Sequence, residues 1–269
     1  MARTGSISAQ LNDDPLTVCA ISVLAGILGN LVHEGLGHAT TALLTGAKSG
    51  TLSTVAWTSS YDSRLVAASG TLANLAAALV FWIVLVKATR ASVRWRYFLL
   101  ISFAFNVLDG CGYFLFSGFT GFGDWATVIA GLPAHWLWRT ILVVVGATSY
   151  YGAAVIVGVG LVRYAGVDRS DSRRLRNLTL IPYVSVVLLS SVAALLNPSG
   201  IQLLWQSALP ATAGGHSGLL WLRYSVPKGT IPVRPSDEIS RNYLWIALAA
   251  VLAVIFIFAL GRGITLRAG

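Results

Sequence analysis

The sequence from residue 17 to residue 44 reads TVCAISVLAGILGNLVHEGLGHATTALL, and this stretch determines what kind of protein the chain is. Lys and Arg are absent from it, and its only carboxylate is Glu34. A helix needs about 20 predominantly apolar residues to cross a bilayer. Backbone groups in lipid must also find their hydrogen-bond partners within the segment. The stretch therefore predicts a transmembrane α-helix.

Further apolar runs of similar length follow at 66–86, 97–116, 136–161, 178–196 and 243–260. Hydrophobic residues make up 55% of the 269-residue chain and charged residues only 11%, whereas globular proteins are roughly 25% charged. So few charges cannot cover a soluble surface of this size. We therefore expect an all-α, polytopic integral membrane protein with about six transmembrane helices, forming one membrane domain over residues 1–269.

The formal net charge of +9 follows the positive-inside rule, because basic residues gather in alternate connections between the apolar runs. We therefore expect the lipid bilayer, and no nucleic acid, as a partner. In a six-span arrangement these connections share one side, which predicts cytoplasmic N- and C-termini in a plasma (inner) membrane. The residues that carry the pattern are Arg3, Lys87, Arg90, Arg94, Arg96, Arg163, Arg169, Arg173, Arg174, Arg176, Arg262 and Arg267.

Three connecting segments are long enough to have structure of their own. Within 46–65, the alternation over 51–57 is typical of a strand or a re-entrant loop. Segment 117–135 is rich in Gly, so we expect it to be irregular and partly within the membrane. Segment 197–242 is the longest, with five prolines, and is either a lid or substrate-contacting loop or an ordinary extracytoplasmic connection.

The acidic residues single out one region. Of the ten, Glu34 and Asp109 lie inside predicted helices, and Asp124 lies just beyond one. A charge within the bilayer costs at least a few kcal/mol, so such residues are usually functional and partnered. His33 and His38 flank Glu34 within six residues of the first apolar run. A polar cluster that joins helices is the alternative, but two imidazoles and a carboxylate so close together favour a metal site.

Zinc is the metal that this residue set predicts. Zinc takes His nitrogen and carboxylate oxygen in a tetrahedral shell, and a catalytic site leaves one position for water. We expect His33, His38 and Asp109 as ligands, with Asp124 as a rival third ligand. Glu34 would be the general base that accepts a proton from the activated water.

The spacing of the histidines departs from the usual His-Glu-x-x-His pattern, in which they stand at i and i+4. At i and i+5 of an α-helix, His33 and His38 would point about 140° apart. A π-bulge would realign them, and Gly35 and Gly37 make the helix easy to distort. Alternatively, Glu34 and His38, at i and i+4, are the ligand pair. We favour the bulge.

The sequence resembles the site-2 protease family of intramembrane zinc metalloproteases over residues 30–120. The shared landmarks are the His33–His38 motif, a Gly-x-x-x-Asn element at Gly70–Asn74, and a Leu-Asp-Gly motif at Leu108–Gly110. This chain has one extra residue in the metal motif, and it lacks the prolines that the family usually places before Leu-Asp-Gly.

The resemblance implies a three-helix catalytic core, here residues 17–135, followed by additional helices and the loop 197–242 in residues 136–269. It implies metal ligation by both histidines and Asp109, a catalytic role for Glu34, and positioning of substrate or oxyanion by Asn74. A helix–helix hydrogen bond is the alternative for Asn74. For Gly70, we expect close helix packing.

Two further histidines lie outside this group. His135 precedes Trp136 and Trp138, which is typical of the aromatic belt at a membrane surface. His216 lies in the 197–242 loop, where we expect it in solvent. Folding back onto the metal is the alternative.

The function predicted from these residues is zinc-dependent hydrolysis of membrane-embedded or membrane-proximal peptide bonds, with another membrane protein as substrate. Two alternatives remain open. One is a metal-dependent hydrolase of a lipid or small amphiphile, and the other is an inactive, metal-bearing subunit of a membrane complex.

Overall fold

The computed structural model describes residues 11–165, 172–198, 200–226 and 237–268. Within them lie six helices that are long and apolar enough to span a membrane, which confirms the all-α, polytopic membrane fold. Arg3, Arg169 and residues 227–236, which entered the charge pattern and the loop prediction, lie outside the described residues. The spanning helices are Pro15–Thr45, Arg64–Lys87, Val93–Thr120, His135–Tyr164, Arg173–Leu195 and Tyr243–Leu260.

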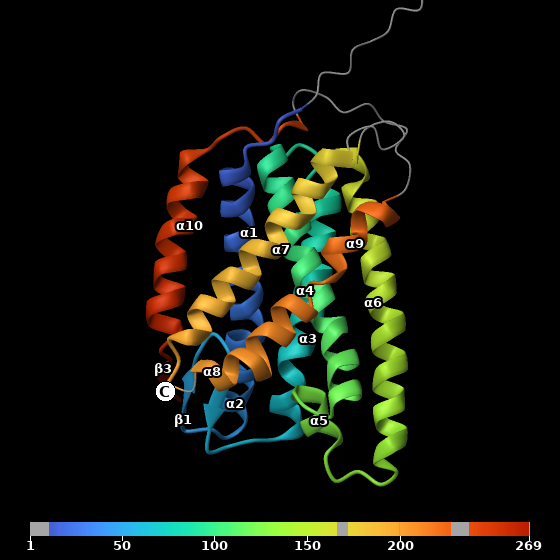
Figure 1. Cartoon of the computed structure of the whole chain (residues 1–269). Coiled ribbons are helices and arrows are strands. Elements are labelled where there is room, and N and C mark those ends of the chain that lie inside the picture. The colour runs from blue at the N-terminus through green and yellow to red at the C-terminus, as the bar shows by residue number, and fades with distance from the viewer. Residues whose placement is uncertain (1–10, 166–171, 199, 227–236, 269) are drawn as a thin grey trace, which may run out of the picture.

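The first span consists of α1 (Pro15–Asn30), the π-helix η1 (Leu31–Ala39) and α2 (Thr40–Thr45). The other spans are α3 (Arg64–Lys87), α4 (Val93–Thr120), α6 (His135–Ala165), α7 (Ser172–Leu195) and α10 (Tyr243–Ile255), which continues into the π-helix η5 (Phe256–Leu260). Figure 1 shows these helices side by side in one bundle. The helix α4 lies at its centre and packs against α1, α3 and α6.

Polar residues just outside the apolar runs set where three helices begin. The side chains of Asp14, Ser63 and Asn242 each accept a hydrogen bond from a backbone amide in the first turn of α1, α3 and α10, respectively. Such caps satisfy amides that have no partner within the helix. The apolar runs thus determine which segments form the spanning helices, and the capping residues determine where these three helices begin.

Segment 51–57 forms part of a hairpin, not a single strand. Strands β1 (Ser49–Leu52) and β2 (Trp57–Ser59) pair antiparallel, with Leu52 opposite Trp57. A third strand, β3 (Ile264–Arg267), pairs antiparallel with the other edge of β1, so the order is β2-β1-β3. The sheet leaves one edge of β2 unpaired by any described strand. Figure 1 shows the sheet at the end of the bundle where α2 and α8 also lie.

Segment 117–135 is less irregular than its glycines suggested. The helix α4 continues to Thr120, and Gly121 ends it in the left-handed conformation at φ 71°. After Gly123, the chain forms the short helix α5 (Asp124–Ile129). This sharp reversal folds α5 back along α3 and α4, and it proves important for the site.

Segment 197–242 is not an ordinary loop. It contains α8 (Gly200–Leu203), the π-helices η2 (Leu204–Ala208) and η3 (Pro210–Gly214), and α9 (Gly218–Ser225). Ser207 bonds the carbonyl of Val55 in the sheet hairpin, whereas Ile239 bonds Asp13 before α1. The segment therefore crosses from one end of the bundle to the other, as Figure 1 also shows.

This crossing changes the expected arrangement of the chain ends. The start of α1 lies beside Ile239 at one end of the bundle, whereas β3 lies with the sheet at the opposite end. The prediction of both termini on one side assumed that 197–242 begins and ends on the same side. The short helices of segment 197–242 were not recognised as a crossing of the bundle, because Pro210 and the glycines around residue 214 interrupt their apolar pattern.

A buried ionic cluster holds the bundle end beside the start of α1. The Arg174 guanidinium, 3% exposed, donates to both carboxylate oxygens of Asp13 at 2.6 and 3.0 Å, and also to the backbone carbonyl of Asp237. Asp237 in turn accepts hydrogen bonds from Arg163. The cluster therefore ties α6 and α7 to the segments that precede α1 and α10.

We expect Arg174→Met to lower the free energy of unfolding by about 3–5 kcal/mol, because it leaves the buried Asp13 carboxylate without its cation. Thermal unfolding in one detergent measures the effect. Arg241→Gln is the matched control, since Arg241 pairs with Asp14 through a side chain that is 52% exposed; exposed pairs contribute little. Equal destabilisation by both variants would contradict the assignment.

Candidate metal centre

The π-helix η1 brings the two histidines together. Its last turn is wide, with the Thr40 amide bonded to the carbonyl of Gly35, five residues back. In such a helix, side chains five residues apart lie on one face. The Nε2 atoms of His33 and His38 are 3.2 Å apart. The π-helix therefore places both side chains on one face, as the bulge explanation requires.

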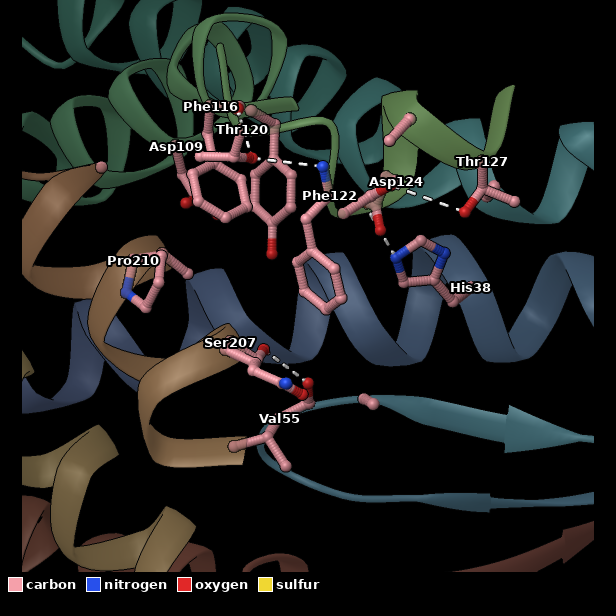
Figure 2. Close-up of a pocket in the computed structure, with 18 of the residues that line it drawn as sticks. His38, Val55, Asp109, Phe116, Thr120, Phe122, Asp124, Thr127, Ser207 and Pro210 are labelled. Atoms are coloured by element: carbon pink, nitrogen blue, oxygen red, sulfur yellow. Dashed lines mark hydrogen bonds and ion pairs between the residues drawn. The ribbon is translucent and has the colours of Figure 1, made fainter. Parts of the chain in front are cut away.

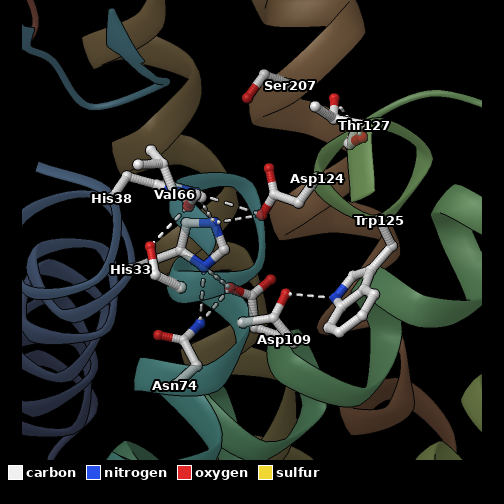
Figure 3. Close-up of polar contacts among 12 residues, drawn as sticks. His33, His38, Val66, Asn74, Asp109, Asp124, Trp125, Thr127 and Ser207 are labelled. Atoms are coloured by element: carbon white, nitrogen blue, oxygen red, sulfur yellow. Dashed lines mark hydrogen bonds and ion pairs between the residues drawn. The ribbon is translucent and has the colours of Figure 1, made fainter. Parts of the chain in front are cut away.

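The aspartate that joins the two histidines is Asp124. Its Oδ2 atom lies 3.2 Å from His33 Nε2 and 3.3 Å from His38 Nε2, and the three residues form a group able to hold a metal ion. Ligand atoms bound to zinc at about 2.0–2.1 Å in a tetrahedron are separated by roughly 3.3 Å. The three donor atoms therefore match three corners of a tetrahedral zinc shell. Figure 3 shows the three side chains converging.

Asp109, the expected third ligand, lies on the other side of the His33 ring. Its Oδ2 atom is 3.9 Å from His33 Nδ1, the nitrogen that faces away from His38. The helix α4 runs past the ring at this level, whereas the reversal at Gly121 returns α5 to the Nε2 side. The structure thus assembles the rival ligand, Asp124, with the histidines. The preference for Asp109 rested on motif and depth, which do not show this reversal.

Asn74 joins Asp109 to His33. Its side-chain amide donates to Asp109 Oδ2 at 2.8 Å and lies 3.3 Å from His33 Nδ1. The helix–helix hydrogen bond considered for Asn74 is therefore present between α3 and α4. A ligating imidazole usually donates its far N–H to an acceptor, whereas the Asn74 amide is a donor; the carboxylate nearest to His33 Nδ1 is that of Asp109. Asn74 is 1% exposed and contacts the back of His33, away from Asp124.

His38 has its own orienting partner. Its Nδ1 atom lies 2.7 Å from the backbone carbonyl of Val66. A proton on Nδ1 would satisfy this carbonyl and leave the Nε2 lone pair directed at Asp124. Both imidazoles, at 3% and 7% exposure, thus present Nε2 to one point.

Close approach of η1 and α3 depends on glycine. A methyl group at Gly70 would lie 2.4 Å from His38 Nε2 and 2.7 Å from His33 Nε2. One at Gly37 would lie 2.6 Å from the Gly70 Cα. Gly70 therefore allows close packing, as expected from the sequence, and it also leaves the space beside the ligand atoms.

Glu34 stands beside this group without belonging to it. It is 5% exposed, and its Oε2 atom has no hydrogen-bond partner among the described residues. The Trp57 backbone hydrogen-bonds its carboxyl group. The group of ligand atoms that the structure brings together contains His33 with His38 and does not include Glu34.

We call His33, His38 and Asp124 together the metal group. A cavity of about 920 Å³ opens next to it. Glu34, His38 and Asp124 all line it, and so do the hairpin and the segment 203–217. Figure 2 shows Phe116 and Phe122 on one side of this cavity, with Val55, Ser207 and Pro210 opposite them. A mostly apolar cleft with a few converging polar groups is typical of a ligand-binding site.

Burial alone would raise the pKa of Asp124, but the hydrogen bonds and charges of His33 and His38 outweigh it. The result is a pKa held well below the ordinary value for aspartate. Asp124 is therefore a carboxylate at neutral pH, the form that binds metals.

Two side chains at the centre were not anticipated from the sequence. The Tyr113 ring stacks on His33 with ring centroids 4.7 Å apart. Tyr113 follows Asp109 by four residues, so the helical period places both on one face of α4 and could have revealed it. Trp125 donates its indole N–H to Thr71 Oγ1 at 3.1 Å, which fixes α5, and so Asp124, against α3.

The remaining histidines have different environments. His135 is exposed at the first residue of α6, and its place in an aromatic belt stays a prediction. His216 is 6% exposed and packs against Phe105, so the expectation of a solvent position was wrong. Burial lowers its pKa to about 4, which leaves it neutral. The cause is the inward path of segment 197–242.

Comparison with family models, with curated proteins and with solved structures finds no match to this chain.

Proposed function

We propose that the protein is an intramembrane zinc metalloprotease-like hydrolase that cleaves peptide bonds within or next to the membrane. One observation carries the proposal: three donor atoms from His33, His38 and Asp124 lie 3.2–3.3 Å apart beside a buried glutamate. Two nitrogens and a carboxylate oxygen suit zinc, and three protein ligands leave a fourth position open.

Bound zinc would supply an acidified water and a Lewis acid for the scissile carbonyl. The chain's own groups supply the rest. Glu34 lines the cavity next to His38 and is placed to accept a proton from water and return it to the leaving amine. The Val66 carbonyl and the Asn74 amide hold the two imidazole rings in place.

The unpaired edge of β2 supports a peptide as substrate. Trp57, Thr58 and Ser59 all line the cavity, so this strand borders the same space as Glu34. An extended peptide can add to such an edge as a further strand. The amide to be cleaved would then lie alongside the metal group.

We expect the purified protein to carry about one zinc per chain, and Glu34→Gln to retain it while losing turnover by about 10²–10⁴-fold, the usual loss for a general base. Elemental mass spectrometry measures zinc, and cleavage of fluorogenic transmembrane peptides in detergent measures turnover. His38→Ala is the comparison that should lose both.

Retained turnover in Glu34→Gln would contradict the role of Glu34. Loss of zinc in that variant would instead favour Glu34 as a ligand.

A lipid-cleaving hydrolase is the second candidate. It is favoured by the aromatic side chains Phe116, Phe119 and Phe122 along the cavity, which suit an acyl chain. Zinc-dependent release of fatty acid, with no peptide cleavage, would identify it. Zinc without either activity would indicate a structural subunit.

A further inference from the structure

The cavity beside the metal group is acidic, although the chain as a whole is basic. Four carboxylate residues line it: Glu34, Asp62, Asp109 and Asp124. Among the described residues, neither Lys nor Arg contributes to its lining. The chain's formal net charge is +9, so this cavity has the opposite sign to the rest of the protein.

Two arginines hydrogen-bond backbone carbonyls of residues that line the cavity or lie next to a lining residue. Arg64 donates to the carbonyl of Ala130 at 2.9 Å. Arg139 donates to the carbonyls of Gly118 and Phe119 at 2.9 and 2.7 Å. Neither guanidinium lines the cavity, and these hydrogen bonds hold both in place.

The four carboxylates have different surroundings. Asp124 belongs to the metal group, and Asp109 is bonded to Asn74. Glu34 lines the cavity, and its Oε2 atom is buried without a hydrogen-bond partner among the described residues. Asp62 is exposed and lies just before the first residue of α3, so it stands at the mouth. A divalent cation at the metal group would lie next to Asp124, whereas Asp62 is the acidic group exposed at the mouth.

We propose that this site selects peptide segments that carry a basic residue near the scissile bond, and that Asp62 sets this preference. The inference rests on the proposed function. A cleft with one sign of charge and low-dielectric walls concentrates ligands of the opposite sign. The same charge disfavours acidic peptides and lipids with phosphate headgroups, because no cation in the lining would pair with them.

Two peptide hydroxamates test the proposal, identical except for Lys or Glu two residues from the hydroxamate. The hydroxamate anchors each probe on bound zinc, so binding is measured without turnover. Fluorescence polarisation with the zinc-loaded, full-length protein in detergent gives both affinities. We expect the Lys probe to bind at least about tenfold more tightly, given the strength of charge pairs in a partly buried cleft, and less so in high salt.

Asp62→Asn should reduce this ratio several-fold, because it removes the charge at the mouth and leaves the metal group intact. The matched control is Glu238→Gln, whose carboxylate accepts from the Asn12 amide at the other end of the bundle; the ratio should not change. Equal binding of the two probes would overturn the inference alone, and an unchanged ratio in Asp62→Asn would overturn the role of Asp62. Failure of both probes, together with zinc-free protein, would overturn the proposed function itself.

Discussion

Gly70→Ala is expected to abolish metal binding. The added methyl would stand 2.4 Å from His38 Nε2 and 2.7 Å from His33 Nε2, closer than any real methyl approaches a nitrogen. Both rings are buried, and their far nitrogens are engaged by Val66 and Asn74. They cannot move aside without giving up those contacts. Zinc per chain should fall from about one to near zero, and turnover should be lost with it.

Gly152→Ala is the matched control, because a methyl group there meets no atom within 4 Å. Zinc content by elemental mass spectrometry should stay unchanged in that variant. The unfolding temperature of each protein in chelator shows whether Gly70→Ala still folds. A folded Gly70→Ala protein with full zinc content would contradict the position of the metal group.

Asp124→Ala is expected to lose zinc, whereas Asp109→Asn is expected to keep it with an affinity about 10–100-fold lower. Asp124 supplies the third corner of the metal group, and two histidines alone make an incomplete shell. Asp109 touches the centre through Asn74 and the back of His33. Losses of 10–100-fold are usual for such supporting partners. Competition with a zinc-binding dye measures both affinities.

His33→Ala provides the scale for complete loss in the same assay. The reverse order, with Asp109→Asn losing zinc and Asp124→Ala keeping it, would restore Asp109 as the ligand. It would also require α4 and η1 to pack differently from the arrangement described here.

The sequence predicted the spans well because each is a long apolar run, and lipid admits few other structures. It also predicted the π-bulge, because two histidines five residues apart in a regular α-helix point in different directions and cannot share an ion. The sequence did not predict that segment 197–242 crosses the bundle. The segment's buried residues Leu219 and Leu222 lie in α9, and Val226 directly follows it; this helix is too short to be recognised as a span.

The choice between Asp109 and Asp124 could not be made from local sequence patterns. Asp109 and Asp124 were both recognised as candidates, and the choice depended on how α5 returns to the bundle. That return is set by Gly121 at φ 71° and by the indole of Trp125 on Thr71. These are contacts between residues far apart in the chain, so local patterns do not contain them.

The pairing of β1 with β3 has a consequence for biogenesis. The hairpin is translated soon after the first span, whereas Ile264–Arg267 follows the last one. Contacts between such distant segments form late, because the long intervening chain must be ordered first. The sheet that borders the cavity is therefore complete only after every span has been inserted. A nascent chain still leaving the ribosome lacks the complete three-stranded sheet beside the cavity, which forms only at the end of assembly.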